Sequence, residues 1–299
     1  MEAVLSSAAN QLPQATRRPL AVPYLQHFGL QEAPFGITPD TAFVFAAHAH
    51  QEALNTLLVA LNSGEGFVKI VGEVGTGKTL LCRRLLRNLQ GADDCLTAYL
   101  PNPGISPEEL LSTLAAELNL PPPENGLPAS LIRRLNEGLL AFARQGKRVV
   151  VCLDEAQAIP QESLETLRLL SNLETEKSKL LQIVLFGQPE LDRNLEDPGI
   201  RQLKQRISFH YRLGALSHRE VDFYLAHRLR VAGSLAETPF TRRSVRALFR
   251  ASGGIPRLIN ILANKSLMAV FGEGGRTVSV SHVRAAARDT EGARVPFWW

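Results

Sequence analysis

A glycine-rich stretch between two apolar runs constrains this chain more than any other feature. The sequence GEVGTGKT at residues 72–79 follows the apolar run FVKIV at 67–71. The next residues, TLLCRRLLRNL at 79–89, have the apolar spacing of an amphipathic helix. A strand, a loop of the form G-x-x-x-x-G-K-[ST] and a helix, in that order, cradle phosphates with backbone N–H groups. The stretch therefore predicts a nucleotide site in an α/β fold.

Each residue type in this loop has a predicted role. The glycines let the backbone curl, and the helix N-terminus adds the positive end of its dipole. We expect Lys78 to reach the β- and γ-phosphates and the Thr79 hydroxyl to ligate Mg²⁺. A glycine-rich turn with a chance lysine is the alternative, which the flanking strand and helix disfavour. The loop residues predicted to bind ATP are Gly72, Glu73, Val74, Gly75, Thr76, Gly77, Lys78, Thr79 and Leu80.

Two acids, Asp154 and Glu155, end the apolar run VVVCL. Adjacent acids after a buried strand are costly unless they serve a cation or a reaction. We expect Asp154 to hold Mg²⁺ and Glu155 to polarise the attacking water as a catalytic base; an ordinary solvated strand end is the alternative. Gln188, in LFGQPEL, can orient that water if its strand lies between the other two. A turn residue before Pro189 is the competing interpretation.

Apolar runs and helical patterns alternate along the first two thirds of the chain. Runs at 67–71, 95–100, 148–153, 180–187 and 207–213 read as strands, which predicts a five-stranded parallel sheet in a three-layer α/β core. After residue 214 the strands stop, and a capping box at Ser217–Glu220 opens a helical region. The predicted units are a flexible arm at 1–22, a core at 23–214, a small all-helical lid at 215–290 and a tail at 291–299.

Charge is unevenly distributed. The chain carries a net charge of +4, but residues 201–299 hold 17 Lys+Arg against 6 Asp+Glu, a net charge of +11. Such a region suits an anionic partner such as nucleic acid, a lipid surface or an acidic protein face; alternatively, its arginines serve a nucleotide site and a subunit interface. No apolar run reaches the roughly 18 residues of a membrane-spanning helix. Three widely spaced cysteines in apolar contexts indicate buried thiols, so we expect a cytoplasmic protein, free or peripheral at the inner membrane.

Three arginines of the basic region are candidate catalytic or sensing groups. Arg201 and Arg206 precede the fifth predicted strand, and Arg257 in GGIPRLIN begins a helix of the predicted lid. An arginine supplied by a neighbour stabilises the charge that phosphoryl transfer builds on the γ-phosphate. We expect Arg206, and secondly Arg201, to act in trans, and Arg257 to bind the nucleotide in cis. Ordinary surface arginines are the alternative for each.

Together these motifs resemble those of AAA+ ATPases. More narrowly, YLQHFGLQEAPFGITPD, LDEAQ, LRLLSNLET, LLQIVLFGQPEL, IRQLKQRI and GGIPRLINILANKSL resemble the ExeA-like, or GspA-like, secretion ATPases, including the ATPases of MSHA pilus biogenesis, over about residues 22–290. The resemblance implies ATP hydrolysis at the subunit interfaces of a ring-like homo-oligomer, with inner-membrane pilus or secretion assembly proteins as partners. It also implies that Phe28, Gly29, Leu30, Pro34 and Phe35 flank the adenine, with core packing as the alternative.

One departure from the ExeA pattern bears on function. ExeA-type proteins continue into a membrane span and a peptidoglycan-binding domain, whereas this sequence stops at RVPFWW, which puts wall binding in doubt. Trp298 and Trp299 either dock on a partner or fold back on the lid. Two other functions stay open. The basic region motivates a DNA-transaction ATPase, such as a transposition target selector or an initiator, although no helix-turn-helix follows the lid. A nucleotide-gated scaffold with low turnover is the third.

Overall fold

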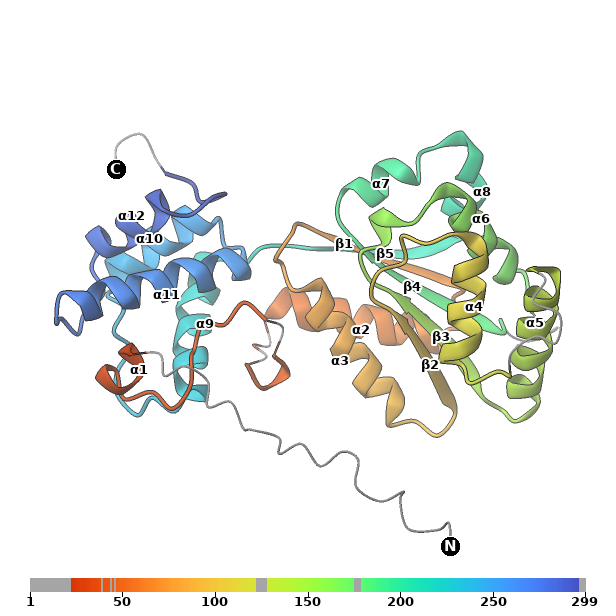
Figure 1. Cartoon of the computed structure of the whole chain (residues 1–299), viewed down its shortest axis with the longest axis horizontal. Coiled ribbons are helices and arrows are strands. Elements are labelled where there is room, and N and C mark those ends of the chain that lie inside the picture. Colours follow the sequence, from red (N-terminus) through yellow and green to blue (C-terminus); the bar gives the residue numbers. More distant parts are fainter. Residues whose placement is uncertain are drawn as a thin grey trace, which may run out of the picture.

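The protein consists of a sheet domain and a helical domain joined side by side (Figure 1). The computed structural model describes residues 23–295 except 39, 44, 46, 122–127 and 175–178. The predicted arm at 1–22 and the two C-terminal tryptophans lie outside the described residues. Every helix of the described part falls short of the length and apolarity that spanning a bilayer requires.

A five-stranded parallel sheet forms the first domain, as predicted. The strand order is β2-β3-β4-β1-β5, so β4 lies between β3 and β1. The central strand β4 is buried throughout because helices cover both faces, whereas the edge strand β5 alternates between more and less exposed residues. The strands are β1 Phe67–Gly72, β2 Cys95–Leu100, β3 Arg148–Leu153, β4 Leu181–Gly187 and β5 Ile207–Leu213.

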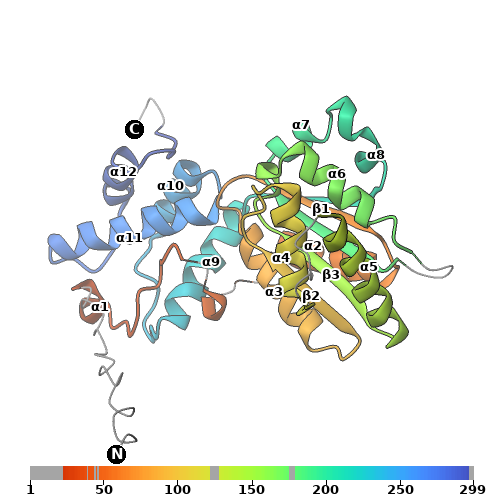
Figure 2. The same ribbon diagram turned by 45° about the vertical axis from the view of Figure 1, so that its right-hand side comes forward.

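Helices cover the two faces of this sheet. The first face carries α2 (His48–Asn62) and α3 (Lys78–Gln90). The other carries α4 (Pro107–Glu117), α5 (Pro128–Arg144) and α6 (Gln161–Leu170), which stand in front of the sheet in Figure 2. Sequence patterns gave no sign of the short helices α7 (Glu190–Asn194) and α8 (Arg201–Lys204), because one helical turn is too short to display a period. Three single 3₁₀ turns occupy Thr41–Phe43, Ala156–Ala158 and Pro198–Ile200.

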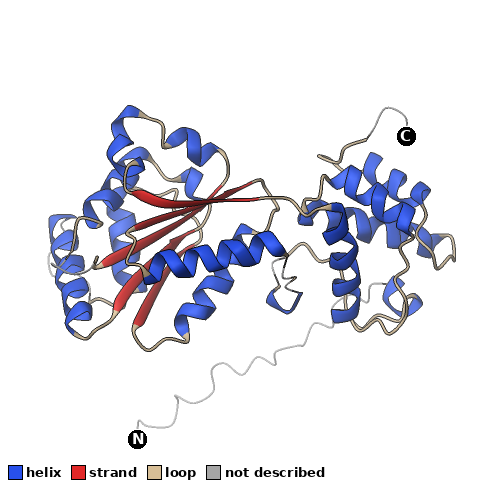
Figure 3. Ribbon diagram, turned by 180° about the vertical axis from the view of Figure 1, so that it is seen from behind, coloured by secondary structure: helices blue, strands red, loops and turns tan. Residues whose placement is uncertain are grey.

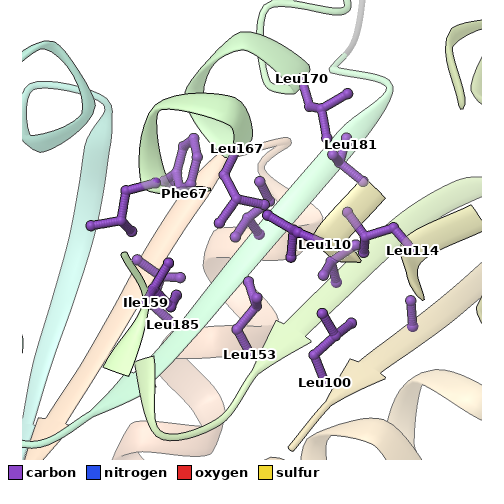
Figure 4. Packing of buried hydrophobic residues seen from close by; sticks show 14 of the residues in the cluster. Phe67, Leu100, Leu110, Leu114, Leu153, Ile159, Leu167, Leu170, Leu181 and Leu185 are labelled. Carbon is purple, nitrogen blue, oxygen red and sulfur yellow. The ribbon is translucent and has the colours of Figure 1, made fainter. Parts of the chain in front are cut away.

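Leucines from the covering helices pack against the sheet. In Figure 4, Leu110 of α4 and Leu167 of α6 point at Leu153 and Leu185 on the sheet. All four side chains are almost completely buried. Burial of one such side chain stabilises the fold by about 1.5–3 kcal/mol, so these contacts fix the sheet edge from which the site residues emerge. The three cysteines are buried free thiols, as predicted.

The second domain is all-helical, as predicted. It contains α9 (His218–Val231), α10 (Arg242–Ser252), α11 (Pro256–Gly272) and α12 (Val280–Arg288). The predicted capping box opens α9: the Glu220 N–H donates to the Ser217 hydroxyl oxygen at 3.3 Å, and the Ser217 N–H donates to the Glu220 carboxylate at 2.8 Å. These two bonds satisfy backbone donors that the first turn of a helix leaves without partners.

The segment before α2 packs with the helical domain, which differs from the predicted start of the core at residue 23. Apolar side chains between Tyr24 and Ala47 share one buried cluster with α9–α12. The short helix α1 (Tyr24–His27) contacts α11, and the Tyr24 hydroxyl donates to Asn264 Oδ1 at 2.5 Å. Figure 3 shows this segment running beside α9 before the chain enters α2. The aromatic residues of this segment therefore complete the core of the helical domain.

Candidate functional site

The glycine-rich loop lies where β1 ends and α3 begins. Gly75 and Gly77 have φ angles of +80° and +101°, in the left-handed region that L side chains rarely adopt. A Cβ on Gly72 would lie 2.8 Å from the carbonyl oxygen of Leu213 on β5. The backbone of the loop therefore requires glycine at these three positions, which explains their pattern in the sequence.

Lys78 is the first residue of α3 and is only 5% exposed. Its Nζ donates to the carbonyl oxygens of Gly72 at 2.8 Å and Glu73 at 3.2 Å. Burial lowers the pKa of Lys78, while the charges of Glu155 and Asp154 act in the opposite direction. A buried ammonium group at a helix N-terminus is the arrangement that favours a bound phosphate.

The acid pair follows β3, next to this loop. Asp154 is 2% exposed and accepts hydrogen bonds from the Thr79 hydroxyl and, at 3.0 Å, from the Glu155 N–H. Burial raises the pKa of the Asp154 carboxyl, and these two bonds oppose the shift. A buried carboxylate beside a hydroxyl is a hard-oxygen pair that fits Mg²⁺ held jointly with phosphate oxygens and water. Within the described residues no group of three or more acids, histidines or cysteines could hold a metal alone.

Glu155 is held by two glutamines. Its backbone is left-handed, with φ 51°, which costs about 1–2 kcal/mol in a residue with a side chain. Its Oε2 accepts hydrogen bonds from Gln157 Nε2 at 2.6 Å and from Gln188 Nε2 at 3.0 Å. Burial raises the pKa of Glu155, but these two bonds and the charge of Lys78 outweigh it, so the pKa lies below its ordinary value. The group is thus an ionised carboxylate in a fixed orientation.

Gln188 reaches Glu155 because β4 lies between β1 and β3, which is the arrangement that its predicted role requires. The Gln188 N–H in turn donates to Gln157 Oε1 at 2.9 Å. Gln157 therefore holds both Glu155 and Gln188, and no sequence motif predicted this role. Its only sequence signal is a polar residue two positions after Glu155, which alone cannot reveal a contact with the end of another strand.

A cavity of about 220 Å³ joins the loop to the helical domain. Arg257, at the start of α11, lies on its wall, and the Arg257 N–H donates to the Gly75 carbonyl oxygen at 3.2 Å. A Cβ on Gly75 would stand 2.6 Å from the Arg257 Cβ, so the two backbones are in close contact. The structure thus brings nine predicted residues to one cavity: Val74, Gly75, Gly77, Lys78, Thr79, Leu80, Glu155, Gln188 and Arg257.

Arg228 of α9 is a wall residue that the sequence did not indicate. It is 7% exposed, donates from Nη1 to the Tyr224 hydroxyl at 3.2 Å and from Nε to the Pro34 carbonyl oxygen, and stacks over Phe43 at 4.6 Å from the ring centroid. Nothing in the sequence of α9 distinguishes Arg228 from an arginine on the exposed face of a helix. Only the packing of the 24–47 segment on α9 reveals it.

Phe28 and Leu30, predicted to flank the base, belong to the helical domain, where Leu30 is in the core and the partly buried Phe28 packs against it. Phe28 packs edge-on against Tyr24 and His27, and Leu30 is buried in the same cluster. Neither residue lines the cavity at Lys78 or the apolar cavity beside it. That second cavity continues from Leu80, with walls formed by Phe43, Phe45 and His50.

Arg206 lies far from the cavity of its own chain. The register of β1 and β5 pairs Phe67 with Ile207 and Gly72 with Leu213, so Arg206 stands at the opposite end of the sheet from the loop. Five residues of strand correspond to about 17 Å. Its Nη1 donates to Ser171 Oγ at 3.3 Å, at the end of α6, and the exposed Arg201 begins α8. Neither arginine is among the residues that line its own cavity.

Comparison with known proteins first defines the class. Residues 61–195 match the AAA domain family. The ORC2 protein of Aeropyrum pernix, solved in ADPNP–ADP complexes, has 20% identity and a TM-score of 0.61, covering 87% of this chain and 73% of that one. Drosophila ORC bound to DNA has 16% identity and a TM-score of 0.63, covering 94% and 70%. The chain has the fold of AAA+ P-loop proteins, as predicted.

A comparison with curated protein sequences then identifies a more specific relative. General secretion pathway protein A of Aeromonas hydrophila is 43% identical over 276 residues, which are 92% of this chain and 50% of that protein. The chain therefore spans half the length of this curated relative. The predicted resemblance to ExeA-like, or GspA-like, AAA ATPases is confirmed at this level.

Proposed function

We propose that the protein binds ATP with Mg²⁺ and hydrolyses it, and that the bound nucleotide couples the sheet domain to the helical lid. One observation carries the proposal: a phosphate-binding loop, an ionised carboxylate and a lid arginine line the same cavity, at Lys78, Glu155 and Arg257. A phosphate group in that cavity would contact both domains at once. Nucleotide binding is supported further by the AAA domain match.

Each residue of the cavity would have a separate role in ATP hydrolysis. The loop N–H groups and Lys78 would bind the phosphates, and Glu155 would accept the proton of the attacking water while Gln188 fixes its direction. Thr79 and Asp154 would hold Mg²⁺, which neutralises phosphate charge when bound. Glu155 is able to accept a proton, because its pKa lies below the ordinary value and the group is ionised at neutral pH.

The arginine finger would come from a neighbouring subunit. Arg206 lies about 17 Å along the sheet from the loop of its own chain, as the register of β1 and β5 requires. It is therefore too far away to act on the cavity of its own chain, and we propose that it serves the cavity of another copy, with Arg201 as the second candidate. This arrangement supports a ring-like homo-oligomer with ATP at the subunit interfaces.

Three variants test this mechanism. Lys78→Ala should abolish ATP binding, measured by equilibrium dialysis with Mg²⁺; tight residual binding would refute the phosphate site. Glu155→Gln should retain binding and lose turnover, and unaltered turnover would refute the base. Arg206→Ala should retain binding and slow hydrolysis, typically by about 10³-fold for a lost arginine finger. Mixing Arg206→Ala with Glu155→Gln subunits should restore part of the activity if the finger acts in trans.

In the cell, we propose that this ATPase drives or regulates assembly of a type IV (MSHA-like) pilus or a type II-like secretion machine, in the manner of MshM. The printed name of the relative, General secretion pathway protein A, supports a secretion role. The site of action would be the cytoplasm or the cytoplasmic face of the inner membrane, with membrane assembly proteins as partners. Deletion of the gene, complemented with wild type or Glu155→Gln, tests the role: piliation or secretion should return with wild type alone.

A DNA-transaction ATPase is the second candidate, and one feature favours it. Helix α10 exposes four arginines that form no ion pair within the described part of the chain: Arg242, Arg243, Arg246 and Arg250. Duplex binding that weakens steeply with salt, and that falls when these arginines become glutamines, would favour this function. No binding at physiological salt would exclude it. A scaffold with low turnover predicts instead that ATP binding changes assembly while Glu155→Gln changes nothing.

A further inference from the structure

Arg206 is held by a neutral hydroxyl at the end of α6. Its backbone is fixed first, because the Arg206 N–H donates to the Leu203 carbonyl oxygen at 2.9 Å just after α8, and α8 packs against α6 (Figure 1). Its side chain is half-buried, and Nη1 donates to Ser171 Oγ at 3.3 Å. Ser171 caps the C-terminus of α6 and is only 2% exposed. The guanidinium of Arg206 is therefore attached to a rigid helix end.

The Ser171 hydroxyl accepts from Arg206 because its own proton is committed elsewhere. Ser171 Oγ donates to the Arg168 carbonyl oxygen at 2.7 Å. A guanidinium has donors only, so it bonds to the lone pairs that this arrangement leaves on the oxygen. The contact restricts a side chain that otherwise has many rotamers, and it brings no negative charge. The hydroxyl thus orients the cation of Arg206 and does not neutralise it.

The two carboxylates near Arg206 are each bound to another cation. Arg168 donates to both oxygens of Glu165, at 2.6, 2.8 and 2.9 Å, and Lys179 bonds to Glu174. These bonds are the main cause of the lowered pKa of each carboxyl, and the charge of Arg206 adds to both shifts, so both acids lie near it. In the part of the chain that the structure describes, Arg206 itself forms no ion pair.

We propose that Ser171 is a positioning residue for the arginine finger, and that Arg168 keeps the finger available by occupying Glu165. The inference rests on the proposed role of Arg206 in trans and adds the residues that prepare it for a neighbouring subunit. Without the Ser171 hydroxyl, the guanidinium would sample many orientations. Without the Arg168 side chain, the carboxylate of Glu165 would be free to pair with it. Either change would weaken contact with a neighbour's γ-phosphate and leave ATP binding to the same chain unchanged.

The first experiment measures ATP affinity and kcat for the full chain, for Ser171→Ala and for a matched control, Ser163→Ala. Ser163 is a fully buried serine about two turns earlier in α6, and its hydroxyl donates to the Ile105 carbonyl oxygen at 2.7 Å. Ser171→Ala should bind ATP like wild type and lose roughly tenfold in kcat, the low end for one hydrogen bond to a charged group. Ser163→Ala should keep the wild-type kcat. Thermal unfolding confirms that both variants are folded.

Subunit mixing separates a lost finger from a damaged active site. Ser171→Ala subunits retain the loop and the base, so Glu155→Gln subunits, which have an intact finger, should restore part of the activity. A general structural defect in Ser171→Ala would not be corrected by a partner that is itself inactive.

Arg168→Gln tests the second part of the proposal. It should retain ATP affinity and lower kcat, because the freed carboxylate of Glu165 captures Arg206. The double variant Arg168→Gln with Glu165→Gln should regain the wild-type kcat, since no carboxylate is left at that position. A purely structural role of Arg168 predicts that the second substitution leaves the loss unchanged or increases it.

A wild-type kcat in Ser171→Ala or in Arg168→Gln would overturn this inference. So would a loss in Ser171→Ala that mixing does not restore, or a loss in Arg168→Gln that Glu165→Gln does not restore. In each of these cases, slow hydrolysis by Arg206→Ala would leave the proposed finger standing. A wild-type kcat in Arg206→Ala would refute the finger and this inference together.

Discussion

The contact between Gly75 and Arg257 gives a prediction whose size follows from the structure. Gly75→Ala adds a Cβ at a φ of +80°, which costs about 1–2 kcal/mol for an L residue. That Cβ would also stand 2.6 Å from the Arg257 Cβ, about 1 Å inside an ordinary carbon–carbon contact. Overpacking of this kind adds about 1–3 kcal/mol unless the lid moves away from the loop.

Gly146→Ala is the matched control. Gly146 has a φ of +74°, and a Cβ there would meet nothing within 4 Å, so only the backbone cost of about 1–2 kcal/mol applies. Urea unfolding should therefore show Gly75→Ala losing more stability than Gly146→Ala. If the lid instead moves to relieve the contact, the stability losses converge, and ATP affinity should fall by about 5- to 150-fold for Gly75→Ala alone, because 1–3 kcal/mol corresponds to that range.

Equal stability losses combined with wild-type ATP affinity in both variants would refute this reasoning. Such a result would mean that the loop and α11 do not stay in contact in solution. Isothermal titration calorimetry with ATP and Mg²⁺ gives the affinity directly. The same two proteins then serve for both measurements, so differences in preparation do not enter.

Three further predictions follow from the buried polar groups. Asp154→Asn should stabilise the nucleotide-free protein at neutral pH, because burial raises the pKa of the carboxyl and so penalises its ionised form. This gain in unfolding free energy should shrink as the pH falls toward the pKa of the carboxyl in the unfolded chain. In the same variant, ATP with Mg²⁺ should no longer stabilise the protein. Gln157→Leu removes a hydrogen bond that lowers the pKa of Glu155, so the acid limb of the kcat/KM profile should shift to higher pH; an unmoved limb would contradict the role of Glu155 as base. Gln182→Leu leaves two backbone carbonyls without their donor and should cost about 2 kcal/mol in urea unfolding; a loss below 0.5 kcal/mol would mean that water replaces the amide.

Local patterns were sufficient for the parts of this protein that depend on short stretches of chain. The five strands and the loop at 72–79 were predictable, because apolar runs, glycines and a lysine carry their signal within a few residues. The position of Gln188 also followed, since parallel strands present their carboxyl ends at one edge of a sheet. The GspA-like resemblance, which the ordered motifs predicted, is confirmed by 43% identity over 276 residues.

Contacts between distant segments were not predictable in this way. His50 reaches Thr76 across 26 residues and Arg228 reaches Pro34 across 194, and neither has a spacing that marks it as buried. The location of the segment before α2 was not predictable for a related reason: its aromatic residues signal a core, but not which core. Phe28 and Leu30 therefore looked like neighbours of the base, whereas Phe43 and Phe45, also aromatic, line the cavity.

The packing of residues 24–47 on the helical domain has a mechanical consequence. The chain passes from one domain to the other twice, before α2 and again between β5 and α9. With two covalent crossings, the motion that we expect to cost least is a hinge rotation of one domain relative to the other, about an axis through the two crossings. The cavity at Lys78 and Arg257 lies between the two domains. A nucleotide bound there would contact both domains and restrict this rotation. A protein shortened to begin at α2 would lose part of the core of the helical domain.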